Sequence, residues 1–248
     1  MKPVLEVCTG CIESVLAAKR GGAYRVELCT GLDEGGMTPS VGFVSKALAI
    51  GGIKVNVLIR PRGGDFLYTA SELDVIMEDI AAAKALGVNG VVIGALTAEG
   101  NIDIPAMQRM MEAAEGLEVT FHRAFDLCRD PRKGLEEIIE LGCHRVLTSG
   151  TAPTAEEGIP LLAELVRQSA GRISIMPGCG VGPKNAARIV SETGAHEIHA
   201  SSRSLLQSGM KFRHEGVGMG KSDADEYARM VTSEEKVRQI VESIVRVG

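Results

Sequence analysis

Short apolar, β-branched segments alternate along the chain with longer segments whose apolar residues recur at helical spacing. The short segments predict strands at Val4–Val7, Arg25–Leu28, Lys54–Ile59, Gly90–Ile93, Glu118–His122, Arg145–Thr148, Ile173–Met176 and Glu197–His199. The longer segments predict helices at Ile12–Arg20, Pro39–Ala49, Ser71–Leu86, Ile104–Glu115, Pro131–Leu141, Thr154–Ser169, Pro183–Thr193 and Ser233–Val245. Apolar strands that alternate with helices indicate parallel pairing.

This alternation predicts the fold class. Eight strand–helix units in 248 residues match the size of a (β/α)8 TIM-type barrel, an α/β fold. An open doubly wound sheet also alternates, but it usually has fewer units, and its dinucleotide-binding forms carry GxGxxG after the first strand. Here that strand runs into Cys8-Thr9-Gly10-Cys11, so the barrel is favoured. With no linker in the pattern, we expect one domain over residues 1–248, with a long loop, 201–232, before the last helix.

Composition narrows the class of protein. The net charge is −5, only 3% of residues are aromatic, and no Lys/Arg cluster stands out, which argues against nucleic-acid binding. No apolar run approaches the ~18 residues of a membrane span, and MKPVLEVC enters a strand without a signal-peptide layout. We therefore expect a cytoplasmic protein whose six cysteines are thiols rather than disulfides.

Charged residues gather where the predicted strands end, and in a barrel that edge carries the active site. The first two strands end in Glu6-Val7-Cys8 and Glu27-Leu28-Cys29, so each glutamate shares a strand face with a cysteine. Because unpaired buried charges are costly, these groups either form structural ion pairs or build one site. For the group as a whole we favour a site. Its candidate catalytic residues are Glu6, Glu27, Arg60, Arg62, His122 and Arg123.

The ends of the seventh and eighth strands have the layout of a phosphate cradle. A glycine turn, Pro177–Val181, is followed one unit later by a serine pair, and many barrels bind phosphate there through backbone N–H groups. Glycine turns also simply end strands. The candidate anion-binding residues are Gly178, Gly180, Ser201 and Ser202. Arg60 and Arg62 would complete the site with bidentate hydrogen bonds.

Three smaller signals stay open. His122 and His199 each end an apolar strand. Each is either a core histidine whose hydrogen bonds are satisfied or a catalytic histidine. Asp65 follows Gly63-Gly64 and is expected to cap the loop or to pair with a nearby arginine. The two glycines would let the backbone pass close to a ligand or flex as a lid.

The thiols suggest metal chemistry. Cys8 and Cys11 form a C-x-x-C at the first strand–helix junction, and Cys29 ends the neighbouring strand. Two or three thiolates suit a soft ion such as Cu(I), whereas one C-x-x-C without a second pair is a weak zinc signal. The other three cysteines are interpreted as ordinary small buried residues.

The stretches RVELC, EGGMTPS, IRPRGGDFLY, VTFHRAFD, RVLTSG and SGMKFR occur in this order. On these motifs the chain resembles the copper homeostasis protein CutC family from Val4 to the last helix. The resemblance implies a (β/α)8-type barrel, a cytoplasmic location, homo-oligomers, and a link to copper handling with Cu(I) at the cysteines that end the first two strands. Carried over, these are Cys8 and Cys29. Cys11 and Cys179 look additional to the family pattern.

Two functions from different classes are therefore carried forward. The first is a Cu(I)-binding homeostasis protein. The second is an enzyme acting on a small phosphorylated or carboxylated metabolite, in which the arginines and glycine turn bind the anion while Glu27 and His122 act as acid and base. Carboxylates there would also suit Mg²⁺, although no motif fixes it. The expected partners are a copper ion or a small anionic metabolite and further copies of the chain, with no nucleic acid and no membrane.

Overall fold

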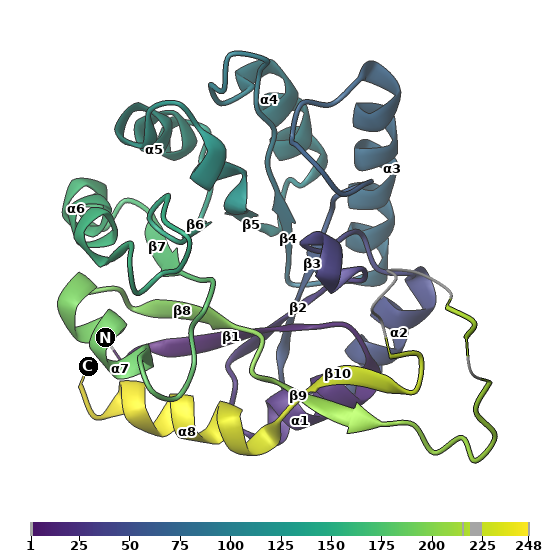
Figure 1. The fold of residues 1–248 in the computed structure, drawn as a ribbon. Helices are drawn as coiled ribbons and strands as arrows, with labels where there is room; N and C mark the ends of the chain where they lie inside the picture. The colour runs from purple at the N-terminus through teal and green to yellow at the C-terminus, as the bar shows by residue number, and fades with distance from the viewer. Residues whose placement is uncertain (1, 215, 219–224, 248) are drawn as a thin grey trace.

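The described residues, 2–214, 216–218 and 225–247 of a computed structural model, contain eight parallel strands that form one barrel with their helices around the outside (Figure 1). The strands are β1 Val4–Thr9, β2 Arg25–Leu28, β3 Lys54–Leu58, β4 Gly90–Ile93, β5 Glu118–Phe121, β6 Arg145–Thr148, β7 Ser174–Pro177 and β8 Glu197–Ala200. The hydrogen-bonded order is β7-β6-β5-β4-β3-β2-β1-β8. β7 and β8 lie next to each other where the barrel nearly closes. The predicted (β/α)8 fold is confirmed.

Helices cover the outer face of the strands and bury their apolar stripes against them. They are α1 Ile12–Arg20, α2 Val41–Ile50, α3 Ala70–Leu86, α4 Ile104–Ala113, α5 Pro131–Glu140, α6 Ile159–Ser169, α7 Ala186–Thr193 and α8 Glu234–Val245. Thr69 and Glu72 form a capping box at the start of α3, and Asp130 caps α5, which satisfies backbone N–H groups that have no partner within a helix. No helix in the described part of the chain has the length and apolar composition needed to cross a membrane.

Several predicted helix starts are too early. Helix α2 begins after Pro39, because Ser40 is its N-cap and accepts a hydrogen bond from Phe43 N. Helix α7 likewise begins after Pro183. Helix α6 starts at Ile159 rather than Thr154, since residues 154–158 form turns. In each case the chain needs extra residues to turn from the strand end onto the outside of the barrel.

The segment predicted as the loop 201–232 contains a two-stranded antiparallel hairpin, β9 Arg203–Gln207 and β10 Ala228–Thr232. Its base is fixed by the barrel, because Ser233 N donates to Ser202 O at 2.9 Å just before α8. The exposed side chains of β9 carry no apolar alternation, so the sequence did not reveal this pairing. Part of the Gly-rich and acidic stretch at 216–226 lies outside the described residues.

Charged side chains, rather than apolar ones, fill the barrel interior towards the amino ends of the strands. Arg25, only 1% exposed, forms ion pairs with Glu6 and with Glu197 Oε2, the latter at 2.5 Å. Arg145 extends the chain of pairs from Glu197 (3.1 Å) to Glu118 (2.9 Å). Each buried charge therefore has a partner of opposite sign, which is the condition for tolerating it there.

Candidate functional site

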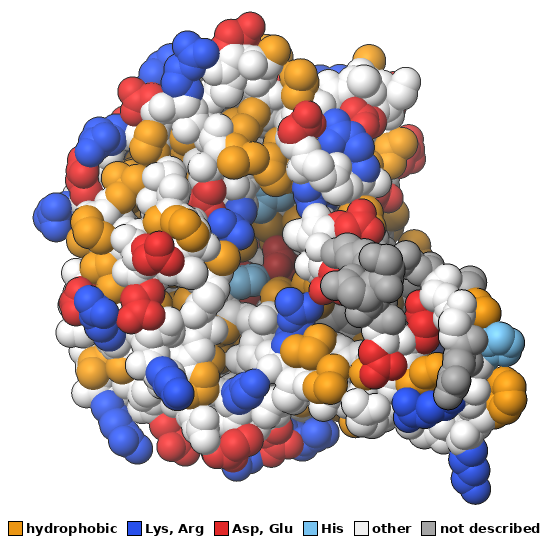
Figure 2. Space-filling model, in the orientation of Figure 1, with side chains coloured by type: hydrophobic (Ala, Val, Ile, Leu, Met, Phe, Trp, Pro, Cys, Tyr) orange, Lys and Arg blue, Asp and Glu red, His pale blue; other side chains and the backbone are white. Residues whose placement is uncertain are grey.

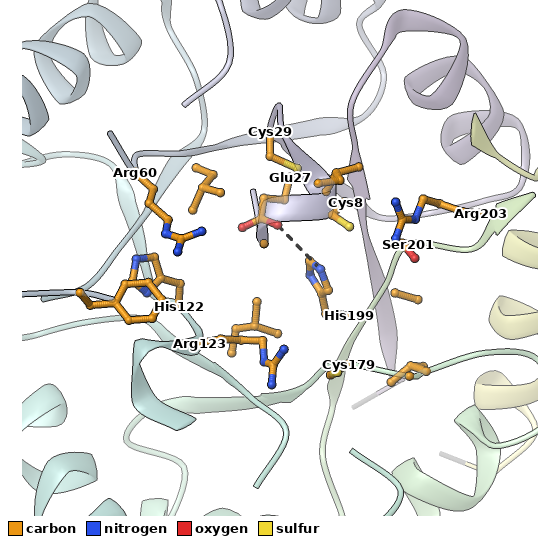
Figure 3. A pocket seen from close by; sticks show the side chains of 18 residues that line it. Cys8, Glu27, Cys29, Arg60, His122, Arg123, Cys179, His199, Ser201 and Arg203 are labelled. Carbon is orange, nitrogen blue, oxygen red and sulfur yellow. Dashed lines mark ion pairs between the residues drawn. The ribbon is translucent and has the colours of Figure 1, made fainter. Parts of the chain in front are cut away.

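A cavity of about 300 Å³ opens at the carboxyl ends of the strands, the edge at which a barrel carries its chemistry. Figure 2 shows this hollow at the centre of one face, with histidine, acidic and basic side chains inside it. Figure 3 shows its polar lining residues: Cys8, Glu27, Cys29, Arg60, His122, Arg123, Cys179, His199, Ser201 and Arg203. The strand ends singled out in the sequence thus converge on one space.

One side of the cavity brings together a thiol, a carboxyl group and an imidazole. Cys8 and Glu27 are paired residues of β1 and β2, and Cys8 Sγ, a Glu27 oxygen and a ring nitrogen of His199 lie within 4.8 Å of one another. His199 Nδ1 is hydrogen-bonded to Glu6 Oε1 at 2.8 Å, and its Nε2 lies 3.7 Å from Glu27 Oε2, as the dashed line in Figure 3 marks. His199 therefore presents Nε2 to this cluster.

The protonation states of this side follow from burial and mutual contact. The hydrogen bond between the two thiols lowers the pKa of Cys8 well below its usual value and raises that of Cys29 well above it. Burial raises the pKa of Glu27 to about 8. Burial would lower the pKa of His199, but hydrogen bonds with Cys8 and Glu6 raise it well above its usual value. These shifts favour the thiolate form of Cys8, the imidazolium form of His199 and the protonated form of Glu27.

Glu6 lies behind the cavity and does not line it. Its carboxylate is shared between Arg25 and His199. Burial raises the pKa of Glu6, but the charge of Arg25 and the hydrogen bond with His199 outweigh it and hold the value at about 2. Glu6 is therefore a positioning residue that fixes the ring of His199, rather than a group that reaches a ligand.

Arg60 lines the opposite side of the cavity and is held by backbone carbonyls. Its Nη1 donates to Glu34 O (3.0 Å) and Gly36 O (2.8 Å), and its Nη2 donates to Gly64 O (2.6 Å). Its guanidinium carbon lies 4.8 Å from the centre of the Phe66 ring. No carboxylate among the described residues pairs with it. Both Gly36 and Gly64 have positive φ (92° and 84°), the conformation that glycine tolerates best, so these glycines shape the cradle for Arg60.

His122 is 4% exposed and lines the same side. Its Nδ1 accepts a hydrogen bond from Ala124 N at 3.2 Å, so Nε2 carries the hydrogen, and within the described residues Nε2 has no hydrogen-bond partner. Burial, with the charge of Arg60, lowers the pKa of His122 to about 3. This neutral state favours a hydrogen-bond donor over the acid or base role suggested by the sequence.

Two further arginines stand at the rim. Arg123 donates from Nε to Asp126 Oδ2 at 2.7 Å and from Nη2 to Ser149 Oγ at 3.3 Å. Arg203, in β9, lies 3.4 Å from Asp33 Oδ1 through Nη1. The sequence did not single out Arg203, because it falls in a segment predicted as loop. The rim therefore adds two cationic side chains to the one supplied by Arg60.

Arg62 lies outside the cavity. It pairs with Asp65 Oδ1 (3.1 Å) and with Glu72 Oε1 (2.5 Å). The pairing of Asp65 with an arginine agrees with its sequence interpretation. β3 ends at Leu58, and Arg62 lies four residues beyond this end. The two-residue alternation of a strand, which places Arg60 inward, no longer applies there, so the backbone carries Arg62 away from the site.

The predicted anion-binding residues divide between the cavity and its surroundings. Gly180 and Ser201 line the cavity, whereas Gly178 and Ser202 do not. A Cβ at Gly178 would lie 2.5 Å from Leu147 Cδ1, so this glycine allows close packing of β6 and β7. Ser202 has φ 49°, and its buried Oγ has no partner among the described residues. A backbone cradle at the seventh and eighth strands is therefore only partly assembled.

The two additional cysteines take different places. Cys179 lines the cavity, has φ 82°, and donates from Sγ to Pro153 O at 3.2 Å. Cys11 is the N-cap residue of α1, and its Sγ lies 3.2 Å from Ser14 Oγ. Cys11 does not line the cavity. The C-x-x-C spacing therefore does not bring the thiol of Cys11 to the thiol of Cys8, which faces the site.

Comparisons with known proteins agree with this architecture. The family model of the CutC family matches residues 3–204. A family protein CutC of Bacteroides thetaiotaomicron is 54% identical over 241 residues, covering 96% of this chain and 97% of that protein. The human copper homeostasis protein cutC homolog is 48% identical over 238 residues (96% and 87%). The crystal structure of a CutC protein from Streptococcus agalactiae has a TM-score of 0.77 at 36% identity, covering 81% of this chain and 99% of that one. This chain belongs to the CutC family.

Proposed function

We propose that this protein takes part in copper homeostasis by holding Cu(I) at the thiol side of the cavity, with Cys8 and Cys29 as ligands and His199 as a third. The name of the human relative, a copper homeostasis protein cutC homolog, supports the link to copper. Thiolate sulfur and imidazole nitrogen are the ligand types that suit Cu(I). Copper is here a cargo, and no step of chemistry on it is required.

The observation that carries this proposal is that ligand atoms of Cys8 and His199, with an oxygen of Glu27, lie within 4.8 Å of one another, while the thiol of Cys29 is hydrogen-bonded to that of Cys8. Metal ligands must be deprotonated, and the lowered pKa of Cys8 favours its thiolate form. Cys29 is fully buried beside it. Since Cys29 and His199 would each lose a proton on binding, the affinity for Cu(I) should rise with pH.

Anaerobic titration of the protein with Cu(I), in competition with a coloured Cu(I) chelator, tests this function. We expect the parent protein to take up copper stoichiometrically, Cys8→Ser to lose this uptake, and Cys29→Ser to weaken it. Cys128→Ser is the matched control, because its part-buried thiol does not line the cavity. Unchanged binding in the double Cys8→Ser/Cys29→Ser variant would refute the proposal.

A second candidate is an enzyme acting on a small phosphorylated or carboxylated metabolite. The observation that favours it is the unpartnered Nε2 of His122 beside Arg60, since a buried donor without a partner is costly unless a ligand completes it. Glu27, with a pKa of about 8, would be protonated at neutral pH and available as a general acid.

Thermal unfolding in the presence of phosphorylated and carboxylated metabolites tests the second candidate. A ligand raises the melting temperature when it binds the folded state, and Arg123→Met should abolish the rise while Arg62→Met, outside the cavity, should retain it. No stabilisation at millimolar concentrations would remove this candidate. The cytoplasmic location and the homo-oligomeric state stay predictions of the sequence.

A further inference from the structure

Two walls of different chemistry face each other across the cavity (Figure 3). The thiol wall consists of Cys8, Cys29 and His199, with the rim residue Arg203 on the side of Cys8, and the donor wall consists of Arg60, His122 and Arg123. The copper site proposed above uses only the thiol wall. The donor wall lines the same cavity, so the natural ligand of the cavity should form favourable contacts with both walls.

The cavity is too large for a bare ion. Its volume of about 300 Å³ is at the lower end of the range of small-molecule pockets, ~300–1,000 Å³, and a single water occupies about 30 Å³. A copper ion on the thiol wall would leave most of this space to solvent. The size instead suits an ion that carries one ligand of amino-acid dimensions.

The charges of the lining argue in the same direction. Arg123 and Arg203 pair with Asp126 and Asp33, whereas Arg60 has no carboxylate partner among the described residues, and Glu27 is the only acidic side chain lining the cavity in the described part of the chain. Arg60 is 5% exposed, and a buried charge is poorly screened by salt. The charge of Arg60 therefore attracts an anionic group, which a complex that carries a carboxylate provides and a bare copper ion does not.

Two buried N–H donors on the donor wall lack partners among the described residues: His122 Nε2 and Arg60 Nε. Leaving a buried donor unsatisfied costs about 1–3 kcal/mol. Acceptor oxygens of a ligand would satisfy them, and a carboxylate offers two such oxygens with the charge that the arginines require. The donor wall is therefore suited to a carboxylate, at the far side of the cavity from the thiols.

We propose that the cavity takes up Cu(I) as its complex with a small carboxylated thiol of amino-acid size, the copper on the thiol wall and the carboxylate on the donor wall. The inference rests on the proposed copper function and names the form in which the cargo arrives. The arriving complex holds Cu(I) between two small thiolates; in the exchange the Cu–S bond to one of them breaks, that thiolate leaves to the solvent, and a Cu–S bond to the thiolate of Cys8 forms. One thiolate replaces another, so copper stays Cu(I), the total charge is unchanged, and no oxidant or reductant is consumed. The second small thiolate remains on the metal.

Co-retention of thiol and copper tests this inference. The protein is mixed anaerobically with Cu(I) and radiolabelled N-acetylcysteine, desalted, and analysed for copper, thiol and protein. N-acetylcysteamine, which has the thiol and the amide but no carboxylate, is the matched probe. We expect copper and N-acetylcysteine to be retained in equal amounts, and at least tenfold less N-acetylcysteamine. Arg123→Met should reduce the retained N-acetylcysteine, whereas Arg62→Met, outside the cavity, should not.

The outcomes separate this inference from the function on which it rests. Copper retained without thiol, or equal retention of the two thiols, would overturn the inference and leave copper binding in place. Retention of the thiol without copper would overturn the inference and would indicate an anion site that does not require copper. If the protein takes up copper neither from these mixtures nor from the acetonitrile complex of Cu(I), both the inference and the proposed function fail.

Discussion

The buried histidine of the donor wall gives a stability prediction with a definite sign. The pKa of His122 falls from an ordinary 6.5 to about 3 because of burial and the nearby charge of Arg60. In the unfolded chain the ring takes up a proton as the pH drops through 6.5, while in the folded protein it stays neutral. The stability that His122 contributes is thus complete above pH 6.5 and is lost as the pH falls towards 3.

The magnitude follows from the same shift. Each pH unit inside that window removes about 1.4 kcal/mol from the free energy of unfolding, so the two units between pH 6.5 and 4.5 remove about 2.7 kcal/mol. His122→Asn is the matched variant, because its side-chain oxygen can still accept the hydrogen bond from Ala124 N that Nδ1 accepts now, yet it does not titrate.

Urea unfolding of both proteins between pH 7.5 and 4.5, followed by circular dichroism, measures the effect. Other titrating groups are common to both proteins, so the difference between them isolates His122. We expect His122→Asn to be less stable at pH 7.5 and the gap to close by about 2.7 kcal/mol at pH 4.5. Curves that stay parallel over this range would show that the imidazole is not held neutral by the fold, and the reasoning would be wrong.

Four further substitutions test other parts of the structure. Glu6→Gln removes one partner of a buried ion pair, and urea unfolding at pH 7 should show a loss of about 3–5 kcal/mol; a loss below about 1 kcal/mol would contradict the pairing. Arg62→Met should leave the urea midpoint unchanged, since its partners are on the surface; a marked drop would reveal an unrecognised structural role. Gly178→Ala places a Cβ 2.5 Å from Leu147 Cδ1 and should cost about 1–3 kcal/mol by overpacking. Gly42→Ala, whose Cβ meets nothing within 4 Å, should be neutral or stabilising, and equal effects of the two would refute the packing argument.

The fold was predictable because its strands are buried on both faces. Such strands are short segments rich in β-branched and other apolar residues, and helices with one apolar stripe separate them, so each predicted strand has a counterpart whose bounds differ by two residues or fewer at either end. The hairpin formed by β9 and β10 has neither property. Its strands lie largely in solvent, and its ends are fixed by hydrogen bonds from Ser233 N to Ser202 O and from Thr232 N to Ser14 Oγ, which no local pattern records.

The site was predictable as a place but only partly as a set of contacts. The carboxyl ends of the strands converge in any parallel barrel, so polar residues at these ends are expected to lie together. On this basis the sequence identified Glu27, Arg60 and His122 as candidates. Which charges face each other depends on the register between strands: Arg25 opposes Glu6 in the pairing of β1 with β2, and that neutralises the glutamate behind the cavity. Register is a property of the assembled barrel, so the sequence could not show that Glu6 acts through His199.

The interior ion pairs constrain how this barrel can change by mutation. Losing one charge in the chain of Glu6, Arg25, Glu197 and Arg145 removes one of the two ion-pair partners of each neighbour in the chain, and breaking a buried ion pair by removing one member costs up to about 3–5 kcal/mol, while replacing two neighbours together by apolar residues of matched volume can be neutral. The effects of such substitutions are therefore strongly non-additive. Random mutagenesis in single steps should almost never exchange these four positions, whereas libraries that vary neighbouring pairs at once should recover folded, hydrophobic replacements.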